Sequence, residues 1–125
     1  MMKTVTSYGQ REIMELLGPA ETQYGGGTAA CNDVVQAGND LPITQVVNMG
    51  KAAGTFNFSW EMYSIKDRMI VRYGSTVLYD TGCVSGNGTV ALTYSGASTQ
   101  VSVEVVPNCD ATTGTAWDFT VSCPL

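Results

Sequence analysis

The sequence predicts an all-β protein: an antiparallel, jelly-roll-like β-sandwich with a short N-terminal helix and an extended arm. Three observations predict this fold. Apolar and polar residues alternate over short stretches, most clearly at Phe56, Phe58, Trp60 and Met62. Glycine-containing turns separate these stretches. Threonine and valine, whose branched side chains suit a pleated sheet, are abundant.

A chain of 125 residues is the size of one domain and buries roughly two-thirds of its unfolded surface on folding. We assign residues 1–50 to the arm and residues 51–125 to the sandwich. Residues 24–40 are rich in glycine, asparagine and aspartate and are predicted to be loop. Residues 41–49 are predicted to hold a first, irregular strand.

A short helix is predicted over residues 10–17 of the arm. Ile13, Leu16 and Leu17 recur at helical spacing and form an apolar stripe, and Gly18 and Pro19 end the helix. Two helical turns are not stable alone, so this helix must dock on another surface. We therefore predict that Ile13, Leu16 and Leu17 are partner-docking residues.

The sandwich itself is predicted from short alternating stretches that end at turn residues. Gly74 and Ser75 form a two-residue linker that suits a type II′ hairpin. Pro107 ends the fifth of these strands, because proline cannot donate to a sheet. The predicted strands lie near residues 54–62, 68–73, 76–81, 88–94, 99–106 and 116–123.

The cysteines Cys31, Cys83, Cys109 and Cys123 allow three pairings. Their spacing matches no metal site, and the chain has no histidine to complete one. The N-terminus lacks the apolar segment of a signal peptide, so we expect reduced, buried thiols as the default. A disulfide between Cys109 and Cys123, which flank the last strand, is the alternative if the protein leaves the cell.

Charge and hydropathy exclude several classes of function. The net charge of −5 disfavours nucleic-acid binding, because too few cations are present to neutralise a phosphate backbone. No apolar stretch is long enough to span a membrane. The basic residues Lys51, Lys66, Arg68 and Arg72 are close in sequence and form either a face that offsets acidic neighbours or a docking patch.

No catalytic constellation is present in the sequence. The absence of histidine removes histidine-based triads, so we expect no enzyme activity and no cofactor. Glu61 and Asp67 bracket a loop, and carboxylates with loop carbonyls are ligands for a structural calcium ion. Ion pairing of Asp67 with Lys66 or Arg68, or turn capping, is the alternative.

The aromatic residues allow a carbohydrate-binding interpretation, because tyrosine and tryptophan rings stack on sugars. Trp60 and Trp117 alternate with polar residues and are assigned to the core. Tyr63, Tyr73 and Tyr79 lie near predicted turns and stay open as stacking residues.

Several segments together resemble a β-sandwich module found in bacterial surface proteins and in structural proteins of tailed phages. They are the residues 60–68, 71–74, 79–82, 84–88 and 114–124. The resemblance covers about residues 54 to 124 and implies a sandwich that acts outside the cell or on a virion. A module of this kind has no single activity, so the resemblance implies fold and setting more than function.

From these points we expect a non-enzymatic phage virion protein: a capsid decoration protein or a small neck, tail or fibre component. It would be made in the host cytoplasm, dock through its arm on other virion subunits and form a homo-oligomer or part of a symmetric assembly. It would bind neither nucleic acid nor membrane. The alternative is a carbohydrate-binding or adhesion module of an extracellular or cell-surface protein, and a secreted effector or inhibitor fragment is a third hypothesis.

Overall fold

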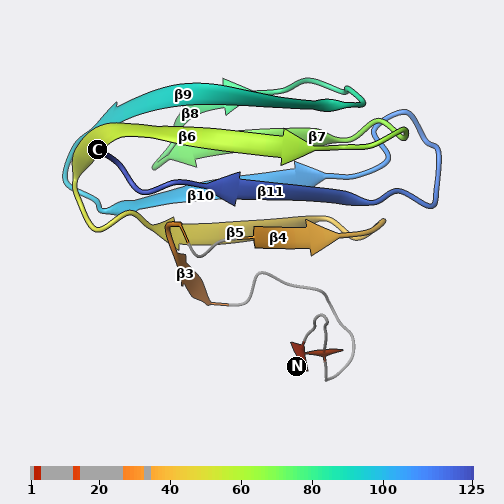
Figure 1. The fold of residues 1–125 in the computed structure, drawn as a ribbon, viewed down its shortest axis with the longest axis horizontal. Coiled ribbons are helices and arrows are strands. Elements are labelled where there is room, and N and C mark those ends of the chain that lie inside the picture. Colours follow the sequence, from red (N-terminus) through yellow and green to blue (C-terminus); the bar gives the residue numbers. More distant parts are fainter. Residues whose placement is uncertain (1, 4–12, 15–26, 33–34) are drawn as a thin grey trace.

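The computed structural model of the chain describes residues 2–3, 13–14, 27–32 and 35–125. In these residues the fold is all-β, and two sheets pack face to face without any helix (Figure 1). The five-stranded sheet has the order β3 (Thr28–Ala30), β5 (Ile43–Asn48), β10 (Gln100–Val106), β7 (Arg68–Tyr73) and β8 (Thr76–Asp80). The four-stranded sheet has the order β4 (Val35–Gly38), β11 (Trp117–Val121), β6 (Ala53–Glu61) and β9 (Asn87–Ser95). The short strands β1 (Met2–Lys3) and β2 (Ile13–Met14) pair with each other.

The chain passes from one sheet to the other at each connection between β4 and β11, except at the β7–β8 hairpin. Tyr73 pairs with Thr76 across that hairpin, and Gly74 opens its two-residue turn with a φ of 61°, as the sequence predicts. The pairs within the sandwich are antiparallel, apart from β3 and β5, which are parallel. The predicted antiparallel sandwich therefore carries one parallel strand at an edge.

The six strands predicted beyond residue 54 correspond to β6 through β11. The boundary placed at residue 50 needs correction, because β3, β4 and β5 belong to the two sheets. In β5 the side chains of Ile43, Gln45 and Val47 are buried while Thr44 is exposed. This alternation makes residues 43–48 a regular strand that pairs along β10, and β3, β4 and β5 are all part of the sandwich.

The helix predicted over residues 10–17 is not supported. Ile13 and Met14 are the described residues of that stretch, and they form β2 in register with β1. Two turns of helix have too few hydrogen bonds to be favoured by sequence pattern alone, so a weak helical stripe is a poor guide. Leu16 and Leu17 lie outside the described residues.

One core fills the space between the sheets. Alternate residues of β6, β10 and β11 point into this core. Phe56, Phe58, Val101, Val103, Trp117 and Phe119 are each at most 2% exposed. Trp60 is half-buried at the margin of this core, where its ring packs on Tyr79 of the opposite sheet at a centroid distance of 5.6 Å. Alternation along β6, β10 and β11 therefore predicted the inner faces of both sheets correctly.

Two glycines of the four-stranded sheet make room for tryptophan rings on neighbouring strands. Gly38 is the Cα partner of Trp117, and a Cβ at Gly38 would lie 2.1 Å from the Trp117 ring. Gly88 is the partner of Trp60, and a Cβ there would lie 2.5 Å from that ring. Such contacts are closer than atoms tolerate, so both positions exclude any larger residue unless the rings move.

All four cysteines are paired, which corrects both expectations about them. Cys31 bonds to Cys123, and Cys83 bonds to Cys109, with Cα–Cα distances of 4.8 Å and 5.8 Å. Cys31 follows β3 of the five-stranded sheet and Cys123 follows β11 of the four-stranded sheet, so the first disulfide joins the two layers. Cys109 and Cys123 flank one strand at opposite ends, and each finds its partner in a different loop.

Candidate functional site

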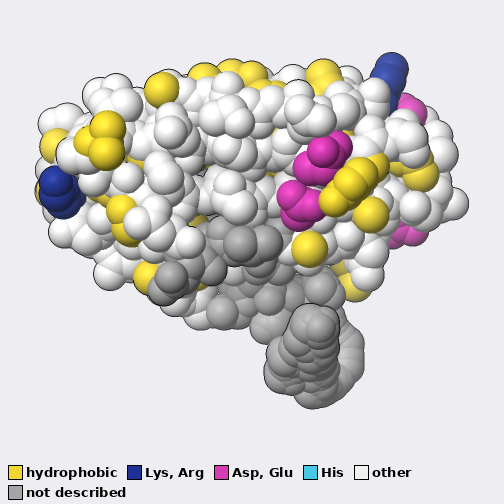
Figure 2. Space-filling model, in the orientation of Figure 1, with side chains coloured by type: hydrophobic (Ala, Val, Ile, Leu, Met, Phe, Trp, Pro, Cys, Tyr) yellow, Lys and Arg dark blue, Asp and Glu magenta, His cyan; other side chains and the backbone are white. Residues whose placement is uncertain are grey.

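The outer face of the four-stranded sheet carries mostly uncharged polar side chains. Along its strands these include Thr55, Asn57, Ser59, Thr89, Thr93 and Thr120, with Ser122 following β11. The hydroxyls of Thr55 and Thr93 lie 2.9 Å apart across β6 and β9, and those of Ser59 and Thr89 lie 3.0 Å apart. Figure 2 views this side of the molecule, where uncharged groups cover most of the sheet and acidic groups gather toward one end.

A hollow of about 310 Å³ opens on this face, lined by Asn32, Asn57, Ser59, Thr120, Val121 and Ser122. The Asn32 N–H donates to the Val121 carbonyl at 2.8 Å, and the Asn32 side-chain oxygen accepts from the Cys123 N–H at 2.7 Å. On the other side, the Asn57 N–H donates to the Ser122 hydroxyl at 2.8 Å. These bonds hold three separate chain segments around the hollow.

Several polar groups of the hollow have unused hydrogen-bonding capacity. The Asn57 side-chain amide and the Thr120 hydroxyl bond to no residue that the structure describes. The Ser122 hydroxyl accepts one bond and keeps its hydrogen to donate. None of the described residues that line the hollow is charged. Chemically, the hollow offers neutral donors and acceptors to a ligand rich in hydroxyl groups.

Beside the hollow, Glu61 and Asp118 are directly opposite each other on β6 and β11. The Tyr63 hydroxyl donates to the Asp118 carboxylate at 2.7 Å, and the Tyr63 N–H donates to Glu61 at 2.9 Å. The Asp118 carboxylate raises the pKa of Tyr63, because it accepts the phenolic proton and disfavours phenolate. The Tyr63 side chain is 53% exposed, so its ring stands at the end of the polar face.

The three tyrosines considered as stacking residues thus separate into two groups. Tyr63 is exposed, while Tyr79 packs against Trp60 and Tyr73 packs against Tyr94. The Tyr73 hydroxyl is also engaged, since it donates to the Ser98 carbonyl and accepts from the Ser98 N–H. Of the three, Tyr63 has a ring that is available to a ligand.

The predicted calcium ligands Glu61 and Asp67 have different protein partners. Asp67 is fully buried and accepts from the Asn108 N–H at 2.9 Å and from the Thr115 hydroxyl at 2.6 Å. The two Glu61 oxygens accept from Tyr63 and from the Asn87 amide. In the described ranges no three acidic, cysteine or histidine residues group around a possible ion. The calcium site stays a prediction, and Asp67 caps the β10–β11 loop.

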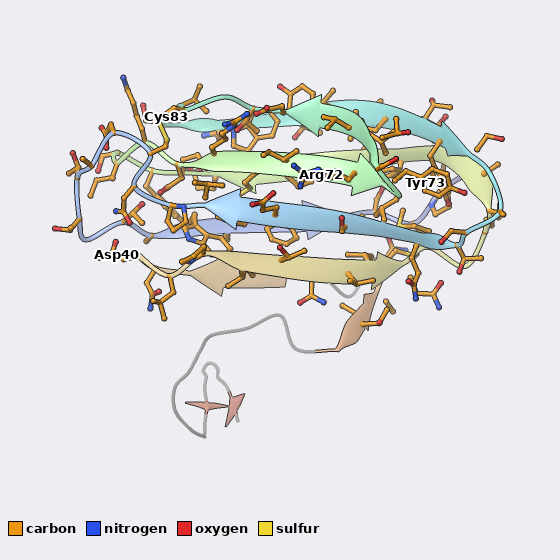
Figure 3. All side chains as sticks on the ribbon, turned by 180° about the vertical axis from the view of Figure 1, so that it is seen from behind. Asp40, Arg72, Tyr73 and Cys83 are labelled. Carbon is orange, nitrogen blue, oxygen red and sulfur yellow. A yellow bond between two sulfur atoms is a disulfide. The ribbon has the colours of Figure 1, made fainter. Side chains whose placement is uncertain are left out.

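A second carboxylate, which no sequence pattern indicated, fixes the same loop. Asp40 accepts from the N–H groups of Gly114 and Thr115 and from the Asn108 side chain. The Gly114 N–H, and then the Asn108 side chain and the Thr115 N–H, lower the pKa of Asp40, because each stabilises the ionised form. Asp40 lies at the same end of the sandwich as Cys83, whose disulfide also holds this loop (Figure 3). The only sequence signal was the loop composition around Asn39, which does not indicate the partners.

Two of the predicted basic residues pair with acids on the five-stranded sheet. Arg68 donates from Nε to Asp80 at 2.9 Å, and Arg72 contacts Glu104 at 2.6 Å. Arg68 lowers the pKa of Asp80 to about 2. Arg72 lies on β7 beside β10, away from the polar face (Figure 3). For these two residues the cluster is a face that offsets acidic neighbours.

The predicted docking residues belong mostly to the part of the chain that is not described. Ile13 lies in β2, and Leu16 and Leu17 are outside the described residues. Their contact with another subunit stays a prediction. In the described strands and loops, no helix has the length and hydropathy that a membrane span requires.

Comparison with known proteins shows a similar fold. No protein-family model matches the chain, and neither does any curated protein sequence. Among solved structures, the chain is similar to the pre-peptidase C-terminal domain of a collagenase from Bacillus anthracis, with a TM-score of 0.61 and 9% sequence identity. The match covers 84% of this chain and 100% of that domain. At this identity the similarity shows a shared β-sandwich fold.

Proposed function

We propose that the chain is a non-catalytic carbohydrate-binding or adhesion module of an extracellular protein, and that it binds through the outer face of the four-stranded sheet. The observation that carries this proposal is the neutral hollow, where the Asn57 amide and the Thr120 hydroxyl have no partner among the described residues. Sites for small polar ligands combine a concave surface with a few convergent hydrogen-bonding groups. The exposed ring of Tyr63 on the same face adds a surface for stacking.

The two disulfides support an extracellular setting. Disulfides form and persist in oxidising environments and are rare in the reducing cytosol. The similarity to a C-terminal domain of a bacterial collagenase is compatible with a binding module appended to a larger protein. Charged groups that would favour an anionic partner are scarce on the polar face, and the acids at its end disfavour such partners.

The strand orders β4-β11-β6-β9 and β5-β10-β7-β8 support the jelly-roll-like interpretation, with β3 as an addition. Jelly rolls occur in both lectins and viral capsid proteins, so the topology alone does not distinguish the two predicted functions. The virion role depends on docking through Ile13, Leu16 and Leu17. It stays a prediction, because the described residues contain no feature that favours it over the binding module.

Retention on insoluble polysaccharides tests the proposal. The full chain is mixed with cellulose, chitin and bacterial cell-wall peptidoglycan, and the bound fraction is measured after washing. We expect retention on at least one of these polymers and competition by its soluble fragments. The same experiment with Tyr63→Ala should weaken retention, whereas Val77→Ala, an exposed residue on the five-stranded sheet, serves as a matched control. Absence of retention on all of them would refute binding to polymers of this kind.

A further inference from the structure

We infer that the hollow on the four-stranded sheet is a subsite for a single uncharged sugar unit, and that the Cys31–Cys123 disulfide holds its walls in place. This inference rests on the proposed function and narrows it to one place and one ligand class. Its first support is the hollow itself, which at about 310 Å³ lies at the small end of ligand pockets. A single sugar ring is a better match for that size than a longer segment of polymer.

The chemistry of the lining favours a neutral, hydroxyl-rich ligand. Each sugar hydroxyl both donates and accepts, and the side chains of Asn57, Thr120 and Ser122 together supply both functions. A cationic or anionic ligand would find no countercharge among the described lining residues and would lose part of its own hydration. The nearby pair of Glu61 and Asp118 further opposes anionic sugars such as uronic acids.

The position of the disulfide links it to both walls. Asn32 is the residue after Cys31, and Ser122 is the residue before Cys123. The Asn32 side chain also accepts the Cys123 N–H, so the disulfide and this hydrogen bond fix the two walls relative to each other. A wall held before the ligand arrives costs less entropy on binding. The second disulfide, Cys83–Cys109, joins loops that supply none of the lining residues.

The test is an NMR titration of the ¹⁵N-labelled full chain with glucose, galactose, mannose and N-acetylglucosamine, each alone. We expect at least one sugar to shift the backbone signals of Asn32, Thr120 and Ser122 and the side-chain amide signal of Asn57. The double variant Asn57→Ala/Thr120→Ala should weaken that binding about tenfold or more, since two hydrogen bonds are lost. Thr93→Ala, on the same face outside the hollow, should bind as the wild type does.

The disulfide part is tested with two matched double variants. Cys31→Ser/Cys123→Ser should weaken sugar binding about tenfold, whereas Cys83→Ser/Cys109→Ser should leave it unchanged. Signal dispersion in the same spectra reports whether each variant is folded. If the first variant does not fold, the disulfides of the folded wild type are reduced instead, and the reduced protein is titrated with the same sugars. The role of this disulfide would be overturned if both folded variants bound the sugar equally well, or if the reduced protein bound it as tightly as the oxidised wild type.

The outcomes separate the subsite from the proposed function. Retention on a polysaccharide without signal shifts in the hollow, or shifts centred on Tyr63 instead, overturns the subsite and leaves the module's function standing. Shifts in the hollow without retention on any polymer support the subsite and overturn polymer binding. The absence of both refutes both proposals.

Discussion

The outer faces of the two sheets differ in whether their polar side chains are paired with each other. On the five-stranded sheet, Arg68 pairs with Asp80 and Arg72 pairs with Glu104. Between these pairs Ile70 is 6% exposed, although it points away from the core cluster. Its cross-strand neighbours are Glu104 and Asp80, and long charged side chains cover apolar surface with their aliphatic stems. This face is therefore closed by its own side chains.

The four-stranded sheet leaves its polar groups open. Its hydroxyls pair only in part, and the Asn57 side-chain amide and the Thr120 hydroxyl have no partner among the described residues. Glu61 and Asp118, two like charges, are placed directly opposite each other, an arrangement that costs stability in a sheet. The charged groups of one face are therefore paired with each other, while the other face retains hydrogen-bonding groups without partners among the described residues.

The largest effect expected concerns the disulfide that joins the two sheets. In the chain-entropy account, removing the 92-residue link Cys31–Cys123 costs about 4–5 kcal/mol, and removing the 26-residue link Cys83–Cys109 costs about 3–4 kcal/mol. Urea unfolding of the two double serine variants measures both values. An equal or reversed order would mean that the tie between the layers contributes less than the tie between the loops.

The next effect concerns Gly38 and Gly88 of the four-stranded sheet, which leave room for the rings of Trp117 and Trp60. Gly38→Ala should lower the free energy of unfolding by about 1–3 kcal/mol, because Trp117 is fully buried and cannot move away. Gly88→Ala should cost less, since Trp60 lies at the half-buried margin. Thermal unfolding of both variants checks the order. Equal stability of Gly38→Ala and the wild type would show that the ring has room to shift.

A smaller effect is expected from acid. The pKa of Asp80 is about 2 in the folded chain, below its usual value of 3.8, so the ion pair stabilises the fold above about pH 4. That contribution is lost as pH falls from about 4 to about 2, and the lowered pKa of Asp40 acts with the same sign. Asp80→Asn should remove part of this pH dependence of Tm. Because the Arg68 and Asp80 side chains are 44% and 33% exposed, the substitution should cost less than about 1 kcal/mol at neutral pH. An unchanged acid profile in this variant would contradict the assignment.

The smallest effect concerns the predicted calcium ion at Glu61 and Asp67. If the ion binds the folded chain and not the unfolded chain, added calcium raises Tm and EDTA reverses the change. The rise should be small, because the carboxylate oxygens of both residues already accept hydrogen bonds from the protein. The variant Glu61→Gln should abolish it. A melting curve that calcium and EDTA leave unchanged would remove the ion from consideration.

Sequence pattern was sufficient for strands that have one buried face, such as β6 and β10, because alternation follows directly from the pleat. It failed for β3 and β4, which have three and four residues, too few to show a period. The disulfides were missed because their pairing depends on where loops meet in space, and the expected reducing compartment argued against them. The hollow was missed for a similar reason: Asn32, Asn57 and Thr120 come from distant segments and carry no local signal.

The two tryptophans differ in exposure, and this difference makes their fluorescence a probe for opening of the sandwich. Trp117 is 1% exposed and its indole N–H donates to the Asn39 carbonyl, whereas Trp60 is half-buried and its indole N–H bonds to no described residue. Trp60 of β6 faces Tyr79 of β8, so its surroundings change when the two layers separate along that margin. Acrylamide should therefore quench the fluorescence of Trp60 before that of Trp117, and quenching of the buried Trp117 reports opening of the sandwich.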